Sequence, residues 1–314
     1  MSKCLTKSPP RVQTLREKSG KRVFLYAIPI LLIVFLFHYF PLWGWSYAFV
    51  EYRPGKSLFE SKFVGMHNFT VLFSNPVMRK NVFRTLINTL GIHFIGYAFM
   101  PLPMIFAIFL SELTSRKFKK IVQTVSTLPH FISWVIMFAL ASSLLSTDGL
   151  INKLMMDWGW IEEPMNVLTT DKNVWITQVL LQQWKNVGWN SIVYFAAIAG
   201  IDQELNEAAM IDGASRMQRI WHITVPHLIP TFFVLLIINT GKMLTTGIDQ
   251  YFVFGNALNK EFIETFDLYI YNLGIGSGKI SYGVAVSTMK SVVSLALFGT
   301  ANFLSKKVRG TGIA

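Results

Sequence analysis

The stretch Glu204-Leu205-Asn206-Glu207-Ala208-Ala209-Met210-Ile211-Asp212-Gly213-Ala214-Ser215, continued by Arg219-Ile220-Trp221-His222-Ile223-Thr224-Val225-Pro226, is a polar segment between two apolar runs. Its acidic residues stand near the start of a short helix predicted at 207–210, where the helix dipole favours negative charge. Small side chains give that helix a surface that a partner can approach closely, and the glycine permits a turn. The proline stands where the next helix is predicted to begin, a favoured place for proline. Residues 202–226 are therefore predicted to form an amphipathic surface element.

Long apolar runs lie on both sides of residues 202–226. The chain has 314 residues, of which 52% are hydrophobic and only 15% charged, whereas soluble domains carry about 25% charged residues. This composition disfavours a soluble enzyme, a nucleic-acid binder and a disordered chain, and the single cysteine disfavours a disulfide scaffold. Crossing a bilayer takes roughly 20 apolar residues. The predicted fold class is all-α, a polytopic membrane protein with six transmembrane helices at about 23–50, 82–110, 121–145, 174–201, 228–246 and 282–304.

The positions of lysine and arginine predict the orientation of these spans, because cytoplasmic loops carry the excess of positive charge. Basic residues crowd the tail 1–22, the loop 116–120 and the tail 306–314, whereas the segment 150–173 is mainly acidic. Both termini and residues 202–226 are therefore predicted to be cytoplasmic, in a multi-pass membrane protein. A signal peptide is the competing interpretation of the first run, but that run is about twice as long as a signal peptide's apolar core of 7 to 15 residues.

Residues 202–226, called the coupling segment below, resemble the EAA motif of permease subunits in binding-protein-dependent ABC importers. That motif has Glu-Ala-Ala, a glycine six residues after the glutamate, and Ile-x-Leu-Pro ending thirteen residues after the glycine. This chain departs from it only at Val225, which replaces the leucine. The resemblance covers about residues 81–305, and the first helix, with Phe37-His38-Tyr39-Phe40-Pro41-Leu42-Trp43-Gly44, is similar to the polysaccharide and oligosaccharide branch of the carbohydrate uptake family.

The resemblance implies a type I ABC importer permease fold in the bacterial cytoplasmic (inner) membrane, in which the EAA loop docks on a separate cytoplasmic ATPase. It also implies a second permease subunit, expected to be a different chain, two ATP-binding subunits and an extracytoplasmic solute-binding protein. The residues expected to couple this chain to the ATPase are Glu207, Ala208, Ala209, Asp212, Gly213, Ala214, Ile223 and Pro226.

The chain is predicted to be a transport subunit and not an enzyme. A phosphate-binding loop needs Gly-x-x-x-x-Gly-Lys-Ser/Thr, and Gly55-Lys56-Ser57 lacks the first glycine because Val50 occupies its place. His222 and His227 have no partners at metal-ligand spacing. No cofactor or metal is predicted for this chain, and ATP with Mg²⁺ is assigned to the partner ATPase.

Polar residues recur at helical spacing inside two of the predicted spans. Residues at i, i+3, i+4 and i+7 share one face of a helix, and buried polar groups in a span usually face a cavity. Amide, hydroxyl and aromatic groups on such faces are suited to a hydrated sugar. The predicted substrate-binding residues are Gln182, Lys185, Asn186 and Trp189 in span four and Asn239, Lys242, Met243 and Thr246 in span five.

These eight positions align with sugar-contacting positions of the maltose-type permease, although the residue types differ. The lysines suggest the hypothesis of an anionic oligosaccharide, of the uronate type such as alginate. The alternatives are that Lys185 and Lys242 extend to the membrane surface or pair with Asp249 or another subunit. Lys290 in span six is a third lysine that topology does not explain.

The predicted function is therefore that of a membrane-spanning permease subunit of an ATP-driven ABC importer. Its cargo would be an oligosaccharide or polysaccharide fragment delivered by a solute-binding protein. The first alternative is an ABC permease for a non-sugar solute. The second is an ion-driven secondary transporter, which would predict an inverted repeat and uptake that survives removal of the ATPase.

Overall fold

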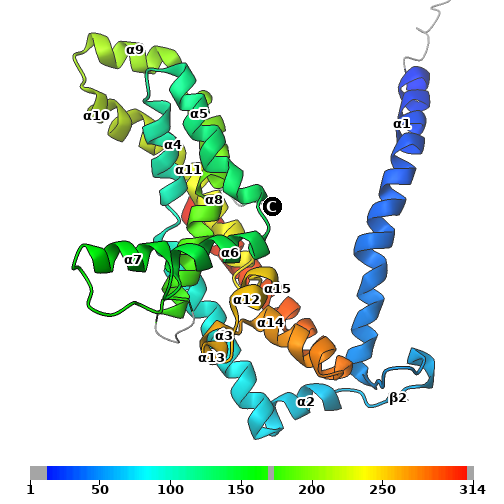
Figure 1. The fold of residues 1–314 in the computed structure, drawn as a ribbon. Helices are drawn as coiled ribbons and strands as arrows, with labels where there is room; N and C mark the ends of the chain where they lie inside the picture. Colours follow the sequence, from blue (N-terminus) through cyan, green and yellow to red (C-terminus); the bar gives the residue numbers. More distant parts are fainter. Residues whose placement is uncertain (1–12, 169–172, 310–314) are drawn as a thin grey trace, which may run out of the picture.

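The computed structural model describes residues 13–168 and 173–309 and is almost entirely helical (Figure 1). The predicted tail before residue 13, with Cys4, and the last five residues of the chain lie outside this range. The α-helices are α1 Gln13–Val34, α2 His67–Ser74, α3 Pro76–Ala98, α4 Leu102–Ser111, α5 Arg116–Thr127, α6 Trp134–Leu145, α7 Leu150–Asp157, α8 Val174–Ala199, α9 Gln203–Ile211, α10 Arg216–Arg219, α11 Val225–Gly241, α12 Asp249–Phe254, α13 Lys260–Ile263, α14 Phe266–Tyr271 and α15 Ile280–Arg309.

Shorter π- and 3₁₀-helical segments connect several of these helices. They are η1 Phe35–Tyr39, η2 Phe40–Phe49, η3 Leu58–Glu60, η4 Leu128–Phe131, η5 Ile220–Thr224 and η6 Asn272–Gly276. A two-stranded antiparallel sheet pairs β1 Val50–Glu51 with β2 Lys62–Phe63, with Val50 opposite Phe63.

Five segments in the described part of the chain are long and apolar enough to cross a membrane. They are Phe24–Phe49, Pro76–Ser111, Trp134–Asp157, Arg216–Gly241 and Ile280–Phe303. The sixth predicted span is α8, whose 26 residues make it about 39 Å long, more than a hydrocarbon core of about 30 Å. Its polar face lowers its hydropathy, since this face carries the side chains predicted to bind substrate. The all-helical architecture is confirmed, and the count of six spans is consistent with it.

Proline residues interrupt two of the spans. Pro29 lies inside α1, and the chain then changes to a π-helix and to a 3₁₀-helix that has proline in its first turn. The second span is divided between α3 and α4, with Pro101 at the junction. Because a proline has no N–H to donate and crowds the preceding turn, each of these breaks has a local cause.

Two spans differ from the sequence prediction. The third was predicted as one run over 121–145, but Pro129 and the Ser133 N-cap divide it into α5, η4 and α6. The fifth was predicted to reach residue 246, but α11 ends at Gly241 and residues 242–248 form a loop. The prediction that Lys242, Met243 and Thr246 extend a helical face from Asn239 is therefore wrong, although these residues remain close along the chain.

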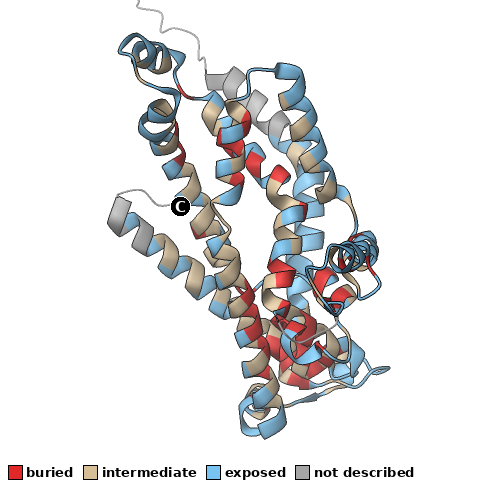
Figure 2. Cartoon of the chain, turned by 60° about the vertical axis from the view of Figure 1, so that its left-hand side comes forward, coloured by how far each residue is buried: buried red, intermediate tan, exposed pale blue. Residues whose placement is uncertain are grey.

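Helix α8 is the centre of the bundle and packs against α3, α4, α5 and α11. Figure 2 shows the buried residues gathered on the inward faces of the helices, with the outward faces exposed. Gly188 of α8 lies directly against the backbone at the end of α5, where an added Cβ would come 2.2 Å from the carbonyl oxygen of Ser126. The close approach of these two helices thus depends on the missing side chain.

Gly188→Ala is expected to destabilise the protein by about 1–3 kcal/mol, because the backbone atoms that it meets cannot move aside. The matched control is Gly299→Ala in α15, where an added Cβ meets nothing within 4 Å. Thermal unfolding of the two purified variants in the same detergent measures the difference. Equal melting temperatures would show that α5 and α8 can move apart without loss of stability.

Helix α1 stands apart from the other helices (Figure 1), and none of its most apolar window is buried in the chain. The start of α1, the start of α5 and the pair α9 and α10 all lie toward one end of the molecule, whereas α2 and β2 lie toward the other. This arrangement agrees with the predicted placement of two of the basic segments, at the start of α1 and the start of α5, on one side. Which side faces the cytoplasm stays a prediction.

Candidate functional site

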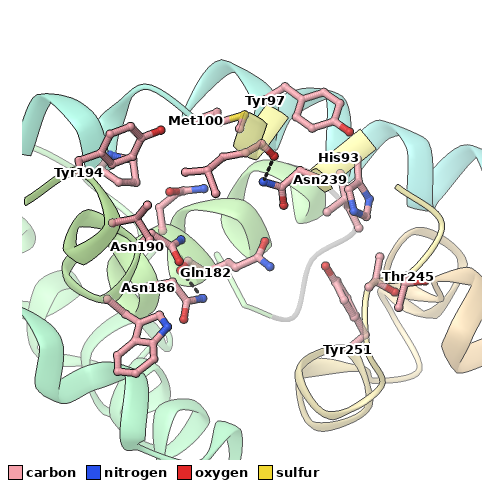
Figure 3. A pocket seen from close by; sticks show the side chains of 18 residues that line it. His93, Tyr97, Met100, Gln182, Asn186, Asn190, Tyr194, Asn239, Thr245 and Tyr251 are labelled. Atoms are coloured by element: carbon pink, nitrogen blue, oxygen red, sulfur yellow. Dashed lines mark hydrogen bonds between the residues drawn. The ribbon is translucent and has the colours of Figure 1, made fainter. Parts of the chain in front are cut away.

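A cavity of about 290 Å³ opens between α3, α8, α11 and α12. It is at the lower end of the size range of small-molecule sites. Figure 3 shows side chains from all four helices pointing into it. The lining residues are Ile92, His93, Gly96, Tyr97, Met100, Pro103, Gln182, Gln183, Asn186, Trp189, Asn190, Val193, Tyr194, Leu235, Asn239, Thr245, Thr246 and Tyr251.

The lining combines amides, hydroxyls and aromatic rings. Among the described residues that line the cavity there is no aspartate, glutamate, lysine or arginine. Asn186 and Asn239 each donate from Nδ2 to the carbonyl oxygen one turn earlier, at 3.0 Å to Gln182 and 2.8 Å to Leu235 (Figure 3). An amide has two donor hydrogens and an acceptor oxygen, so these groups keep hydrogen-bonding capacity for a polyhydroxylated ligand.

The ring of Trp189 packs against His130 and Phe131, which lie in η4 between α5 and α6. Its ring stacks on His130 with centroids 4.3 Å apart and an interplanar angle of 3°, and the edge of Phe131 meets it at 5.5 Å. Nδ1 of His130 donates to Oδ1 of Asn186 at 2.9 Å. The tryptophan is thus a fixed aromatic surface in the cavity wall, which suits the apolar face of a sugar ring.

The structure brings five of the eight predicted substrate-binding residues into this cavity: Gln182, Asn186, Trp189, Asn239 and Thr246. Lys185, Lys242 and Met243 do not line it. Met243 is 8% exposed and packs inside the protein. Three of the four residues predicted to share a face of α8 therefore line the cavity, as does Asn239, whereas Lys185 does not. The roles of the eight residues stay a prediction.

Lys185 is turned toward the protein interior. Its Nζ donates to the carbonyl oxygens of Pro129 (3.0 Å), His130 (2.8 Å) and Ile132, and the residue is 7% exposed. A buried ammonium group is tolerated when its donors are satisfied in this way. Lys185 therefore fixes the helix break that supports Trp189.

The other two lysines differ from each other. Lys290 forms an ion pair with Asp267. Lys242 is exposed where α11 ends, three residues after Asn239 and three before Thr245, both of which line the cavity. Within the described parts of the chain no carboxylate lies within salt-bridge distance of it. The predicted alternative of a pair with Asp249 is not formed.

Sequence reasoning missed the contribution of α3 and α12 to the cavity. His93, Tyr97 and Met100 lie at i, i+4 and i+7, so the same helical spacing that identified α8 marks them. Nδ1 of His93 donates to the carbonyl oxygen of Thr89 at 3.0 Å. Tyr251 lies in a short helix after the loop 242–248, and no periodic pattern in the sequence predicts that it lines the cavity.

The coupling segment folds into two short helices joined by a turn. Asp202 caps α9 by accepting from the N–H of Glu204 at 3.0 Å, and Gly213 has φ +78°, the left-handed conformation that favours glycine. Glu207, Ala208 and Ala209 lie on α9, and Asp212 and Ala214 lie in the turn. Ile223 lies in η5 and Pro226 in the first turn of α11. At the end of α9 the side chain of Ile211 is 87% exposed.

Two features connect the coupling segment to the cavity. Residues Arg216–Gly241 form one continuous helix of 26 residues, so Asn239 lies about 35 Å along the helix from its start. Nε of Arg216 also donates to Oε2 of Glu112 at 2.6 Å, just after α4 ends. A displacement at α10 would therefore be transmitted toward Asn239 along the continuous helix and toward Pro103 along α4, and both residues line the cavity.

Comparison with known proteins gives consistent matches. The family described as binding-protein-dependent transport system inner membrane component matches residues 99–310. The polygalacturonan/rhamnogalacturonan transport system permease protein YteP of Bacillus subtilis (strain 168) is 39% identical over 298 residues, covering 93% of this chain and 90% of that protein.

Two solved structures are also similar. The first is a bacterial ABC transporter involved in the import of the acidic polysaccharide alginate, with a TM-score of 0.81 and 30% identity over 95% of this chain and 100% of that chain. The second is a bacterial alginate ABC transporter in complex with an alginate pentasaccharide-bound periplasmic protein. Its TM-score is 0.81, with 29% identity over 96% of this chain and 100% of that chain.

Proposed function

The chain belongs to the family of binding-protein-dependent transport system inner membrane components, and from this premise we propose that it carries oligosaccharides of an acidic, uronate-type polysaccharide across the membrane. It is a multi-pass permease subunit of an ABC importer for sugars, and the predicted family, fold and transport role are confirmed. The observation that carries the proposal is the cavity of amides, hydroxyls and one fixed tryptophan between α3, α8 and α11.

The chemistry of the relatives supports an acidic cargo. Polygalacturonan and alginate are both chains of uronic acids, in which each ring has hydroxyl groups and a carboxylate. Hydroxyl groups match the neutral lining of the cavity, since amides donate and accept hydrogen bonds. The carboxylates need a cation outside that lining.

Lys242 is the lysine that suits this role best. Lys185 and Lys290 are engaged by carbonyl oxygens and by Asp267. Lys242 is exposed where α11 ends, between Asn239 and Thr245, which line the cavity. An ammonium group contributes a charge-assisted hydrogen bond to a carboxylate. We therefore assign substrate contact to Gln182, Asn186, Trp189, Asn239, Lys242 and Thr246. Lys185 and Met243, which are buried and do not line the cavity, would support its wall without touching the substrate.

The test is Lys242→Gln in the importer reconstituted with its partner chains. Uptake of galacturonate oligosaccharides is expected to need about tenfold more substrate for half-maximal rate, the size of one charge-assisted bond. Uptake of neutral arabinose oligosaccharides is expected to change by less than about twofold. Lys242→Arg, which keeps the charge, is the matched control. Equal losses for acidic and neutral oligosaccharides would contradict charge recognition by Lys242.

The single coupling segment and the exposed surfaces of this chain support the proposed partner subunits. One coupling segment serves one ATPase, so a machine with two ATP-binding subunits needs a second permease chain. The uncovered apolar surface of α1 and the cavity's opening between helices suit such a partner. A solute-binding protein would deliver the oligosaccharide to the end that carries β1, β2 and α2, with both termini of this chain in the cytoplasm. ATP and Mg²⁺ would be bound by the ATPase subunits.

A further inference from the structure

The loop between α11 and α12 is one wall of the cavity and has little regular structure of its own. Thr245 and Thr246 of this loop line the cavity. Gly247 follows with φ +77°, a conformation that gives the loop a sharp turn. Something outside the loop must therefore hold it in place.

Asp267 of α14 is that anchor. Its Oδ2 accepts from the main-chain N–H groups of Thr246 at 2.9 Å and of Gly247 at 3.1 Å. Its Oδ1 accepts from Nζ of Lys290 on α15. One carboxylate thus joins the loop, α14 and α15 through three charge-assisted hydrogen bonds.

The burial of this pair excludes a simple surface role. The side chains of Lys290 and Asp267 are 15% and 11% exposed, and Lys290 lies inside the membrane-spanning segment Ile280–Phe303. Charged groups within a span are costly and are usually kept because they serve a function. Neither residue lines the cavity among the described residues, so neither is placed to touch the cargo.

We propose that Asp267, neutralised by Lys290, is a positioning residue that sets the permease's affinity for its cargo by fixing Thr245 and Thr246 in the cavity wall. This rests on the proposed function for the identity of the cargo. Lys290 neutralises the buried carboxylate, and the two amide hydrogen bonds do the positioning. Losing the acceptor at residue 267 would let the wall move, and a displacement of about 1 Å at a binding surface weakens binding strongly.

Two double variants separate the anchor from the charges. Asp267→Asn/Lys290→Met and Asp267→Leu/Lys290→Met are both neutral, so neither leaves an unpaired buried charge. The asparagine keeps a carbonyl oxygen for the two loop N–H groups, and the leucine, of similar size, does not. If the leucine variant does not assemble, Asp267→Ala/Lys290→Met takes its place, because it also lacks the acceptor.

The measurement is uptake of galacturonate oligosaccharides by the complete importer in proteoliposomes, as a function of oligosaccharide concentration. The leucine variant is expected to need about tenfold more oligosaccharide for half-maximal uptake than the asparagine variant, with a maximal rate within about twofold. A loss of maximal rate at unchanged half-saturation, or equal half-saturation in both variants, would overturn the proposal.

A second readout needs no cargo and so separates this proposal from the proposed function. Thr246→Cys, in a chain whose Cys4 is replaced by serine, reports the position of the loop through its rate of reaction with a water-soluble thiol reagent. The rate is expected to be several-fold higher in the leucine background than in the asparagine background. Equal rates overturn the anchor. If wild-type protein takes up no galacturonate oligosaccharide but the rates differ, the proposed cargo fails and the anchor stands.

Discussion

Replacing Ile211 with aspartate is expected to lower ATP-driven uptake by about 100-fold, the effect of losing a hot spot worth about 2–3 kcal/mol. This side chain is 87% exposed at the end of α9, beside the turn made by Gly213. In the proposed complex with the ATPase, this exposed isoleucine at the end of α9 would be an apolar anchor in the ATPase cleft. A carboxylate at the same position would have to lose its water in that cleft without a partner.

The direct measurement is the amount of ATPase subunit that co-purifies with the permease, followed by oligosaccharide-stimulated ATP hydrolysis. Ile211→Leu keeps the apolar volume and is expected to retain both. Ile275→Asp is the matched control, because Ile275 is 70% exposed but lies in η6, away from the coupling segment. It is expected to leave ATPase association unchanged. Wild-type association of Ile211→Asp would show that the docking surface lies elsewhere.

The coupling segment was predictable because its structure is local. A cap, a short helix, a left-handed glycine and a helix start are each determined by residues within a few positions of one another. The sequence predicted a helix at 207–210, and the structure extends it to Gln203–Ile211. The turn predicted at Gly213 is confirmed by its φ of +78°. The spacing of these signals also carried the family resemblance, which the comparisons confirm.

The environments of the lysines were not predictable, because their partners are distant in sequence. Lys185 meets carbonyl oxygens 53 to 56 positions away, and they are available only because Pro129 breaks the third span. Asp267 is 23 positions from Lys290. Helical spacing shows which residues share a face of one helix, but it does not show which face a neighbouring break or loop will cover.

The end of α11 was misjudged for a related reason. Residues 242–246 carry no proline, and Gly241 alone did not distinguish a helix end from a helical glycine. The structure shows that Gly241 lies against Phe298 of α15, where an added Cβ would come within 2.5 Å of the ring. Tertiary packing and the Asp267 anchor therefore decide where this helix ends, and neither is visible in the local sequence.

Trp189→Ala is expected to have the second large effect, raising the oligosaccharide concentration for half-maximal uptake by about 30-fold. The tryptophan supplies the largest flat ring in a cavity whose lining also includes amides, hydroxyls, three tyrosines and aliphatic side chains. His130 covers its back face, so the ring cannot turn away and its free face stays presented to the cavity. A surface held in one orientation loses little entropy when a sugar ring packs on it.

The matched control is Trp184→Ala on the same helix. Trp184 is 51% exposed against 41% for Trp189, but it does not line the cavity. The same side chain is thus removed from the same helix, five positions apart, and only one removal faces the cargo. Trp184→Ala is expected to change half-saturation by less than about twofold.

The comparison also separates cargo binding from support of the helix break. Ala at 189 leaves His130 with its hydrogen bond to Asn186, at 2.9 Å, but without the ring on which it stacks. Trp189→Phe keeps an aromatic face for both His130 and the sugar and is expected to recover most of the affinity. Basal ATP hydrolysis is expected to stay unchanged in all three variants, because the coupling segment is untouched. A parallel fall in basal ATP hydrolysis and uptake for Trp189→Ala would instead mean that the ring holds α5 and α8 together and that the cargo packs elsewhere.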